Sequence, residues 1–441
     1  MNANNYFNVA VIGGGISGTS LMYVLAKYSD IGSIALFEKY DEIASVNSNA
    51  KSNSQTLHCG DIETNYTLQK AAKVKKTANM LKHYALNHGY NERHIFKFKK
   101  MALGVGEDEV AYIKKRYEEF KELYPYMELW NETRLAELES ALTLERSEPI
   151  IAMGAMDEYT AVDFGAIAKS FISNAKEANE NCELFLNHEI ERIEKIGDKF
   201  RLDSANGEYF FADYVVVDAG AHSLLLAHEM GYGLEYSALP IGGSFFFSNK
   251  EVLNSKVYTV QNPKLPFAAV HGDPDIIDGR VRFGPTALAL PKLERYHSAH
   301  FLDFLESLNP DPEVFEVFYD LVKDEDIRDY IAKNFMYEIP GIRRKLFIKE
   351  IQKIVPTLTS DDIEYAEGIG GLRPQVIDKV NKKLLLGEAK IDKKDGIVFN
   401  MTPSPGATSC LGNAYEDAKI ACKYLGAEFK EYDFKKELVE R

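Results

Sequence analysis

Three glycines near the start of the chain have the type and spacing of a phosphate-binding turn. Gly13, Gly15 and Gly18 form a G-x-G-x-x-G pattern between an apolar run over residues 9–12 and a helical pattern over residues 16–28. Gly13 permits a tight turn, Gly15 lets a pyrophosphate approach the backbone, and Gly18 lets helix and strand pack closely. The first turn of the helix adds free N–H groups and a partial positive charge. This combination is typical of dinucleotide binding.

An acidic residue ends the second predicted strand of the same unit. Glu38 follows an apolar run over residues 34–37 and stands twenty residues after Gly18. Its carboxylate can accept hydrogen bonds from a ribose diol, and its charge repels a 2′-phosphate. Strand, glycines, helix, second strand and acid in this order are far more specific than the glycines alone. The alternative is a glycine-rich turn in an ordinary βαβ unit.

Two later strands also lead into small-residue turns and helices. The first covers residues 211–217 and ends at Ala219 and Gly220, and the second begins at residue 398 and ends at residues 406–409. A helix N-terminus stabilises the negative charge of a reduced flavin. FAD is long enough to need one helix end for its pyrophosphate and another for its ring, whereas a nicotinamide enzyme usually completes its site within one contiguous domain. The pattern therefore favours FAD over NAD. The alternative for the last turn is a routine connection that closes the sheet.

A polar stretch over residues 45–60 follows the second strand. It is too polar for a core element and too short for a disordered linker. A loop at this place in a nucleotide-binding unit commonly faces the ligand, although a plain surface loop is the alternative. The predicted cofactor contacts are Gly13, Gly15, Ser17, Gly18, Glu38, Ser52, Asn53, Ser54, Ala219, Gly220, Gly406, Ala407, Thr408 and Ser409.

The composition bounds the class of protein. The chain has 441 residues, enough for two domains, and its net charge of -15 argues against nucleic acid as a main partner. Its four cysteines lack C-x-x-C spacing, which argues against a zinc or iron–sulfur site and favours reduced thiols in the cytoplasm. No signal peptide and no apolar stretch of ~20 residues is recognisable, so we expect any membrane association to be peripheral.

The predicted fold class is α/β, with a Rossmann-like FAD-binding domain on a parallel sheet and a second, α+β domain on a mostly antiparallel sheet with helices. Short strands separated by turn signals over residues 239–290 indicate the antiparallel sheet, residues 301–354 read as mostly helical, and residues 154–164 read as a connector. We assign residues 1–70, 150–235 and 360–441 to the FAD-binding domain. Residues 71–149 and 236–359 form the predicted substrate-binding domain.

Several stretches carry a resemblance to a known family. They are Gly13–Gly18 with Glu38, Ser52–His58, Glu63–Thr67, Val217–Gly220, Gly243–Phe245, Gly284–Ala287, Gly371–Gln375 and Met401–Ser409. In these the chain resembles the malate:quinone oxidoreductases, within the FAD-dependent enzymes that include D-amino-acid oxidase and L-2-hydroxyglutarate dehydrogenase. Residues 50–58 depart from the Gly-Trp-Asn-Asn-Ala-Gly-Thr-Gly-His run of many members, and Val270–Gly272 looks more like the hydroxyglutarate enzymes. The chain thus resembles a divergent, shorter branch.

The resemblance implies FAD-dependent oxidation of L-malate to oxaloacetate, with electrons passed to a membrane quinone. It also implies a cytoplasmic protein in peripheral contact with the inner face of the cytoplasmic membrane. One alternative is oxidation of L-2-hydroxyglutarate or another 2-hydroxy acid. A second alternative is a dinucleotide-binding protein without turnover. The oligomeric state is not predicted.

Oxidation of a 2-hydroxy acid needs a cation for the carboxylate and a base for the hydroxyl proton. Arg373, in a glycine-rich stretch that we expect to be a loop, is the predicted carboxylate ligand, with a surface arginine as the alternative. His271, expected at the end of an apolar strand, is the predicted base, with a core histidine as the alternative and His58 as the runner-up. The further predicted substrate contacts are Arg282, Lys264 and Gln55.

A membrane-contact patch is predicted over residues 341–349. This segment mixes four cations with four large apolar residues, as interfacial helices do. The alternative is an amphipathic helix with its apolar face in the core.

Overall fold

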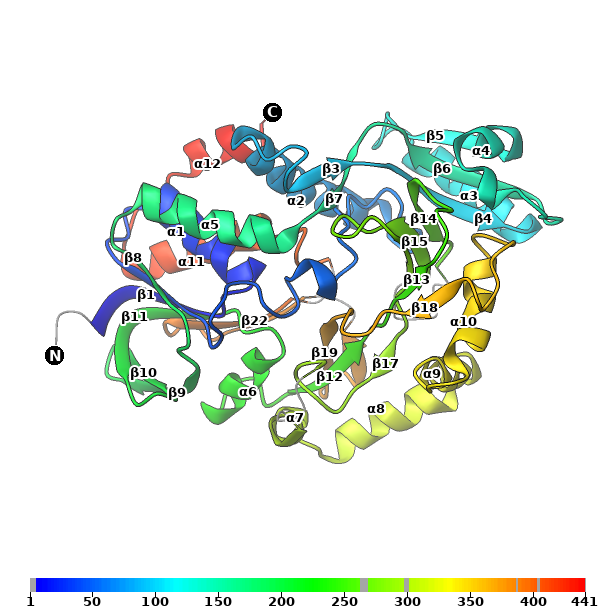
Figure 1. The fold of residues 1–441 in the computed structure, drawn as a ribbon. Coiled ribbons are helices and arrows are strands. Elements are labelled where there is room, and N and C mark those ends of the chain that lie inside the picture. Colours follow the sequence, from blue (N-terminus) through cyan, green and yellow to red (C-terminus); the bar gives the residue numbers. More distant parts are fainter. Residues whose placement is uncertain (1–4, 262–268, 297–300, 386–387, 403–404, 441) are drawn as a thin grey trace.

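The computed structural model describes residues 5–261, 269–296, 301–385, 388–402 and 405–440 (Figure 1). Its first large sheet starts from the predicted unit, in which β1 (Tyr6–Ile12), α1 (Ile16–Tyr28) and β2 (Ile34–Phe37) follow one another. The parallel strands of this sheet are ordered β22-β11-β1-β2-β8. The later members are β8 (Cys182–Phe185), β11 (Tyr209–Val217) and β22 (Ile397–Met401). The prediction that residues 211–217 join the first strand is confirmed, since Val9 pairs with Tyr214.

Both faces of this sheet are covered, which explains its continuous apolar strands. On one face lie α1, α5 (Phe164–Ala178) and α11 (Cys410–Leu425), and their apolar side chains form one core with β1 and β2. The other face is covered by the hairpin of β9 (Ile190–Ile196) and β10 (Lys199–Ser204) and by α6 (His222–Glu229). An antiparallel edge strand, β21 (Ala389–Asp392), pairs with β22.

A second eight-stranded sheet lies on the right in Figure 1. Its neighbours are antiparallel except for β14 and β4, which confirms the expected mostly antiparallel sheet. Its strands, in spatial order, are β18 (Ile363–Tyr365), β13 (Phe246–Ser248), β16 (Val281–Gly284), β15 (His271–Pro274), β14 (Ser255–Thr259), β4 (Lys99–Val105), β6 (Ile150–Ala155) and β5 (Glu128–Asn131). The helices α3 (Glu107–Phe120), α4 (Glu132–Leu138) and α10 (Arg343–Gln352) pack against it.

A third sheet of four strands joins the two large ones. It is ordered β17 (Leu288–Ala289), β12 (Tyr236–Gly242), β19 (Leu372–Asp378) and β20 (Lys383–Leu385). The helices α7 (Phe301–Leu308), α8 (Pro312–Lys323) and α9 (Glu325–Met336) lie along its outer side in Figure 1. The side chains of Val314 and Val317 on α8 pack with Leu239, Ile241 and Ile377 of this sheet.

Three local predictions are wrong. Residues 154–164 are not a simple connector, because β6 ends within them and β7 (Tyr159–Val162) pairs with β3 (Ile95–Lys97). His271 begins β15 and does not end a strand. Arg373 does not lie in a loop, because it is a residue of β19 and pairs with Ile241.

The segment over residues 341–349 follows the alternative interpretation. Phe347 and Ile348 on α10 are buried in the core of the second sheet, where the Phe347 ring stacks on Phe246 with ring centres 4.4 Å apart. Its cations remain outside. The predicted domain boundaries stay a proposal. We note that α2 (Leu68–Asn87) shares a core with α11 and α12 (Glu431–Leu438), on the side of the first sheet.

Candidate active site

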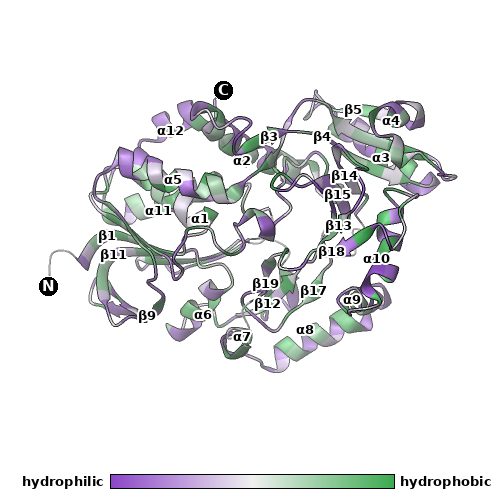
Figure 2. Ribbon diagram, viewed as in Figure 1, coloured by the Kyte–Doolittle hydropathy of each residue, from purple (hydrophilic) through white to green (hydrophobic). Residues whose placement is uncertain are grey.

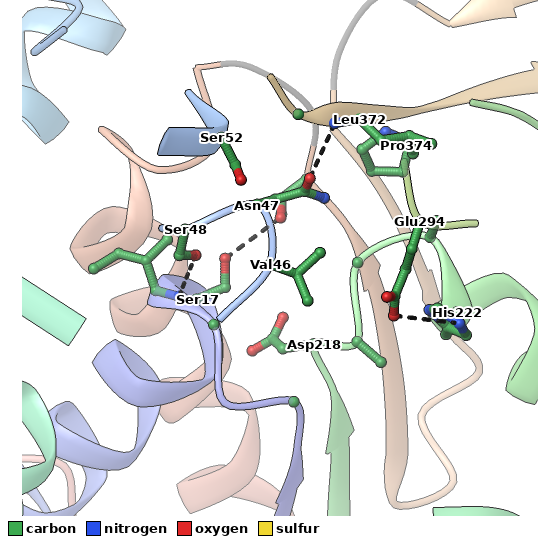
Figure 3. Close-up of a pocket in the computed structure, with 18 of the residues that line it drawn as sticks. Ser17, Val46, Asn47, Ser48, Ser52, Asp218, His222, Glu294, Leu372 and Pro374 are labelled. Carbon is green, nitrogen blue, oxygen red and sulfur yellow. Dashed lines mark hydrogen bonds and ion pairs between the residues drawn. The ribbon is translucent and has the colours of Figure 1, made fainter. Parts of the chain in front are cut away.

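A cavity of about 670 Å³ opens at the carboxyl ends of the parallel strands. It is bounded by the β1–α1 turn, the loop over residues 44–58, the turn after β11, and the start of β19. Figure 3 shows side chains from these distant segments directed into one space. Its place matches the rule that ligands of open α/β sheets bind outside the carboxyl ends of the strands.

The glycine turn forms one wall of the cavity, and two of the three glycines of its G-x-G-x-x-G pattern leave no room for a side chain. Gly13 has φ +114°, and a Cβ on it would lie 2.4 Å from the Asp218 carbonyl oxygen. A Cβ on Gly18 would lie 2.1 Å from the Gly13 carbonyl oxygen, so this glycine permits the helix to pack on the turn. Gly15 faces the cavity, where only the Ser48 hydroxyl, 3.3 Å away, would meet a Cβ. The cradle therefore fits a group that approaches the backbone closely, as a pyrophosphate does.

Glu38 lies beside this turn and lines the cavity. One carboxylate oxygen accepts the Gly14 N–H at 2.8 Å and the other accepts the Tyr40 N–H at 2.9 Å. Burial raises the pKa of Glu38, and these two N–H donors oppose that effect. Each carboxylate oxygen keeps a lone pair for a further donor, so Glu38 can still receive a ribose hydroxyl.

A cluster of charged side chains closes the cavity near Glu38. Glu294, from the chain after β17, pairs with the Lys39 ammonium, accepts the Tyr40 hydroxyl at 2.6 Å, and lies 3.9 Å from His222. Burial alone would raise the pKa of Glu294, but Lys39, Tyr40 and His222 outweigh it and lower the pKa to about 2. This carboxylate is therefore ionised at neutral pH, and it ties the β2 end of the first sheet to the segment that precedes α7.

Most of the predicted cofactor contacts line this one cavity. Those that do are Gly13, Gly15, Ser17, Glu38, Ser52, Asn53, Ser54, Ala219, Gly220, Ala407 and Thr408. Gly18 lies behind the turn, Gly406 is not part of the lining, and the Ser409 hydroxyl is 3.2 Å from that of Thr77 instead. The Thr408 hydroxyl accepts the His58 backbone N–H at 3.2 Å, which joins the start of α11 to the polar loop.

His58 and Arg373 also line the cavity. The His58 Nδ1 lies 2.6 Å from Glu63 Oε1, and its Nε2 lies 3.5 Å from the Ser54 hydroxyl. Because a carboxylate can only accept, Nδ1 carries the proton and Nε2 is the basic atom. The segment that leads into β19 touches the polar loop that carries His58, since the Gly370 N–H donates to the Lys51 carbonyl at 2.9 Å.

The Arg373 guanidinium is surrounded by tyrosines. The ionisable groups that act on it are the hydroxyls of Tyr66, Tyr258 and Tyr330, and burial lowers its pKa from the usual value. Among the residues that the structure describes, no carboxylate pairs with it. Arg373 is half-buried in the cavity wall, and a partly desolvated cation without an anionic partner suits an anionic ligand.

His271 lies one layer behind the cavity wall. Its ring is buried and stacks on Tyr258 with ring centres 4.4 Å apart, and it does not line the cavity. Its Nδ1 lies 2.5 Å from Asp273 Oδ1. Burial lowers the pKa of His271, so the ring is neutral. Burial alone would raise the pKa of Asp273, but Lys256, His271 and Arg282 outweigh it and hold the pKa well below its usual range.

The remaining predicted substrate contacts lie away from the cavity lining. Arg282 is fully buried and pairs with Asp273 at 3.3 Å and with Asp275 at 3.1 Å. Gln55 is also buried and donates to Asp275 at 3.1 Å. Lys264 falls outside the described residues. The structure thus places Arg282 and Gln55 in one buried polar cluster with His271.

Sequence reasoning missed several residues of the cavity. Val46, Asn47 and Ser48 come from the polar loop that was expected to face the ligand, but only its later residues were chosen (Figure 3). The Ser48 hydroxyl accepts the Ile16 N–H at 2.9 Å, and Asn47 Oδ1 accepts the Leu372 N–H at 3.0 Å. Asp218 also lines the cavity, although the sequence marks it only as a member of the segment Val217–Gly220. Its burial and the nearby Asp417 raise its pKa to about 7.

The comparisons with known proteins agree with this geometry. The chain matches the profile of the malate:quinone oxidoreductase family over residues 5–416. A probable malate:quinone oxidoreductase of Campylobacter jejuni is 52% identical over 98% of this chain and 99% of its own length. The malate:quinone oxidoreductase of Helicobacter pylori strain J99 is 46% identical over 98% of both chains.

Solved structures share the fold. L-α-glycerophosphate oxidase from Mycoplasma pneumoniae, solved with FAD bound, covers 96% of each chain with a TM-score of 0.66 and 18% identity. Glycine oxidase from Geobacillus kaustophilus covers 95% of each chain with a TM-score of 0.65 and 16% identity. Within the described part of the chain, no helix combines the length and apolarity needed to cross a bilayer. The sequence match across residues 5–416 and the near-complete alignment with named relatives show that this chain belongs to the malate:quinone oxidoreductase family.

Proposed function

We propose that this chain oxidises L-malate to oxaloacetate with FAD as its cofactor and passes the electrons to a quinone. The observation that carries the proposal is that Arg373 and His58, which share Tyr258 as a neighbour, line the same cavity as the glycine turn. An anion-binding cation, an oriented imidazole and a pyrophosphate cradle are the parts that this reaction needs.

The cofactor would be held along the whole cavity. The N–H groups of the β1–α1 turn face its pyrophosphate, Glu38 its adenosine ribose, and the start of α11, at Ala407 and Thr408, its ring. When bound there, FAD supplies the acceptor for the hydride that leaves C2 of malate. The loop over residues 52–54 would border the ring.

Arg373 binds the C1 carboxylate of malate in this proposal. Its guanidinium can form two parallel hydrogen bonds with a carboxylate, which fixes the orientation of the substrate as well as its position. Burial of the guanidinium lowers its pKa, and the same reduced contact with water strengthens its interaction with a carboxylate.

His58 takes the hydroxyl proton in this proposal, in place of His271. His58 lines the cavity, and its basic Nε2 lies 3.5 Å from the hydroxyl of Ser54, which lines the cavity too, whereas His271 is buried and is not part of the lining. Glu63 holds the imidazole in the required tautomer and stabilises the imidazolium that forms. His271 positions Tyr258, whose ring also lies 6.3 Å from the centre of the His58 ring.

Anaerobic addition of L-malate to the purified yellow protein tests the proposal. We expect the flavin absorbance to bleach with L-malate and much more weakly with D-malate or L-2-hydroxyglutarate, and to return when a quinone is added. Protein with bound flavin that is not reduced by L-malate would contradict it.

The same titration tests Arg373. The Arg373→Ala variant should keep its FAD but need about 10- to 100-fold more L-malate for half-reduction, because a charged hydrogen-bonding partner of the carboxylate is lost. Arg280→Ala is the matched control, since Arg280 pairs with Asp278 on an exposed surface. Equal titration curves for the two variants would remove Arg373 from the substrate site.

A quinone acceptor requires access to lipid, so we also propose peripheral contact with the inner face of the cytoplasmic membrane. The segment over residues 341–349 does not support that contact by itself, because its largest apolar side chains are in the core.

A further inference from the structure

Exposed apolar side chains are concentrated on one group of helices. The described chain has 21 large apolar side chains that are strongly exposed, and ten of them lie between residues 301 and 342. These ten belong to α7, α8, α9 and the approach to α10. Scattered exposed apolar residues are normal, but a concentration of this kind marks an interaction surface.

On α8 the exposed residues form a stripe. Phe315, Tyr319 and Val322 follow the i, i+4, i+7 spacing of one helix face, and the Phe315 side chain is 66% exposed. The opposite face carries Val314 and Val317, which are buried against the third sheet. The helix thus has two apolar faces, of which the fold covers one. Figure 2 shows the hydrophobic and hydrophilic residues of α8 along the lower edge of the molecule.

The helix α9 also exposes apolar side chains. Ile331 and Phe335 are four residues apart, and the Phe335 side chain is 57% exposed. Arg328 lies one turn before Ile331 on the same face and is exposed. Lys323 is exposed at the end of α8. The polar residues of α8 and α9 are mostly acidic, so this surface would meet lipid through its aromatic and aliphatic side chains and not through attraction to anionic headgroups. The acids are Glu313, Glu316, Asp320, Glu325, Asp326 and Asp329, and the cations are Lys323, Arg328 and Lys333.

The inner side of the same helices reaches Arg373, the proposed carboxylate ligand in the cavity. Tyr330 on α9 is one of the tyrosines that act on Arg373. Asn334, one turn later, accepts the Ala287 N–H at 2.7 Å, and α8 packs on the sheet that contains β19. One pair of helices therefore separates the predicted substrate site from the exposed stripe.

We propose that the outer faces of α8 and α9 form the surface that docks on a lipid bilayer. We define this lipid-facing surface as Phe315, Tyr319, Val322, Ile331 and Phe335. The choice of a bilayer rests on the proposed quinone acceptor, because a quinone dissolves in lipid and must be reached close to the substrate end. The surface places the bilayer next to the helices that cover Arg373, so the electrons cross the shortest part of the protein.

Vesicle flotation of the FAD-loaded full chain tests the surface. The double variant Phe315→Gln, Phe335→Gln removes the two most hydrophobic contacts, and vesicles of phosphatidylcholine with phosphatidylglycerol are the probe. The matched control is Tyr432→Gln, because Tyr432 is 73% exposed on α12, at the far end of the molecule (Figure 1). We expect the double variant to bind vesicles about a hundredfold more weakly, roughly tenfold for each ring, while the control binds as the unmodified chain does.

Malate oxidation with a water-soluble dye separates this inference from the proposed function. The double variant should keep its rate with the dye and lose its rate with a quinone held in the vesicles. Unmodified protein that fails to float, or a double variant that floats equally well, would overturn the surface even if malate reduces the flavin. A double variant that floats normally but changes from dimer to monomer would assign the surface to a second copy of the chain. Flotation that depends on the surface, without malate oxidation, would overturn the proposed function alone.

Discussion

Two histidines lie on either side of Tyr258, and only one of them reaches the cavity. His58 and His271 both have a carboxylate at Nδ1, at 2.6 Å and 2.5 Å respectively. Each ring therefore has the same kind of hydrogen-bonding partner, and the two differ in whether the ring lines the cavity or is buried away from it. A base must lie within hydrogen-bonding reach of the proton that it takes, so the histidine in the cavity wall is the better candidate.

Substitution separates the two roles. We expect His58→Asn to lower kcat with L-malate by about 10²- to 10⁴-fold with a small change in KM, because general-base catalysis is lost while Arg373 still binds the carboxylate. His271→Asn should lower kcat far less, since it acts only through the position of Tyr258. Steady-state kinetics with flavin content as the control measure both. If His271→Asn were the more damaging change and His58→Asn were mild, the two assignments would have to be exchanged.

At the scale of the element, β14, β15 and β16 hold a buried set of charges behind the site. Lys256, Asp273 and Arg282 are fully buried, and His271 is 2% exposed. Lys256 lies 3.0 Å from Asp273 and 3.2 Å from the Thr56 hydroxyl, which ties these strands to the polar loop. Such a set is stable only when its charges balance, so an added proton on His271 would disturb it.

This set makes the stability of the chain depend on pH. Burial lowers the pKa of His271 in the folded chain. As the pH falls through about 6.5, His271 therefore binds a proton in the unfolded chain but not in the folded chain. The contribution of a neutral His271 to the free energy of unfolding is fully present above that pH, and it is lost as the pH drops through it. The pKa of Asp273 is held far below its usual range, so Asp273 stays ionised in both states above about pH 5 and adds no slope there.

Thermal unfolding at pH 7.5 and pH 5.5 tests this expectation. The unfolding midpoint of the unmodified chain should fall between the two, and His271→Asn, although less stable at pH 7.5, should lose less on acidification. His94→Asn is the control, because His94 is only half-buried and its Nδ1 bonds a backbone carbonyl, that of Arg93, at 2.9 Å and no carboxylate. If the unfolding midpoints of His271→Asn and His94→Asn fell by the same amount between pH 7.5 and pH 5.5, a neutral, buried His271 would be refuted.

The elements also show what the sequence can and cannot predict. The helix over residues 16–28, the acid after β2 and the turns after β11 and β22 are local patterns, and each lies where its spacing predicts. Arg373 was expected in a loop because its neighbours are glycines and proline. Its place in β19 depends on pairing with Ile241, which is distant in the sequence.

How deeply a side chain is buried is the other property that the spacing of residues in the sequence does not predict. Arg282 and Gln55 have the right chemistry for a dicarboxylate, but they lie in the buried cluster away from the cavity lining, where Asp273 and Asp275 already pair with them. The same limit applies to residues 341–349, whose alternation of cations and apolar residues fits a lipid surface and a core-packed helix equally well. Only the stacking of Phe347 on Phe246 decides between them.

At the scale of the whole molecule, the cavity joins all three sheets. Its lining runs from Ile12 in the first sheet through Phe245, beside the second, to Pro374 in the third, and ends at Thr408. A bound dinucleotide therefore contacts segments from both ends of the chain. A ligand that binds only the folded state stabilises everything whose unfolding destroys its site.

Removal of FAD should accordingly lower the stability of the whole chain and not of one part. With free FAD at a hundredfold excess over its Kd, the expected stabilisation is about 2.7 kcal/mol, which calorimetry of stripped and reconstituted protein would record as a rise of the main transition. Gly15→Val should remove most of this rise, because its side chain would occupy the space that faces the pyrophosphate, whereas the fold itself has room there apart from the Ser48 hydroxyl at 3.3 Å. Gly32→Val is the matched control, since its Cβ would also meet a single side-chain oxygen, that of Asn8 at 3.1 Å, and Gly32 is not part of the cavity lining. A transition that FAD leaves unmoved, or a scan in which only one of two separate transitions responds, would show that the cavity does not couple the sheets.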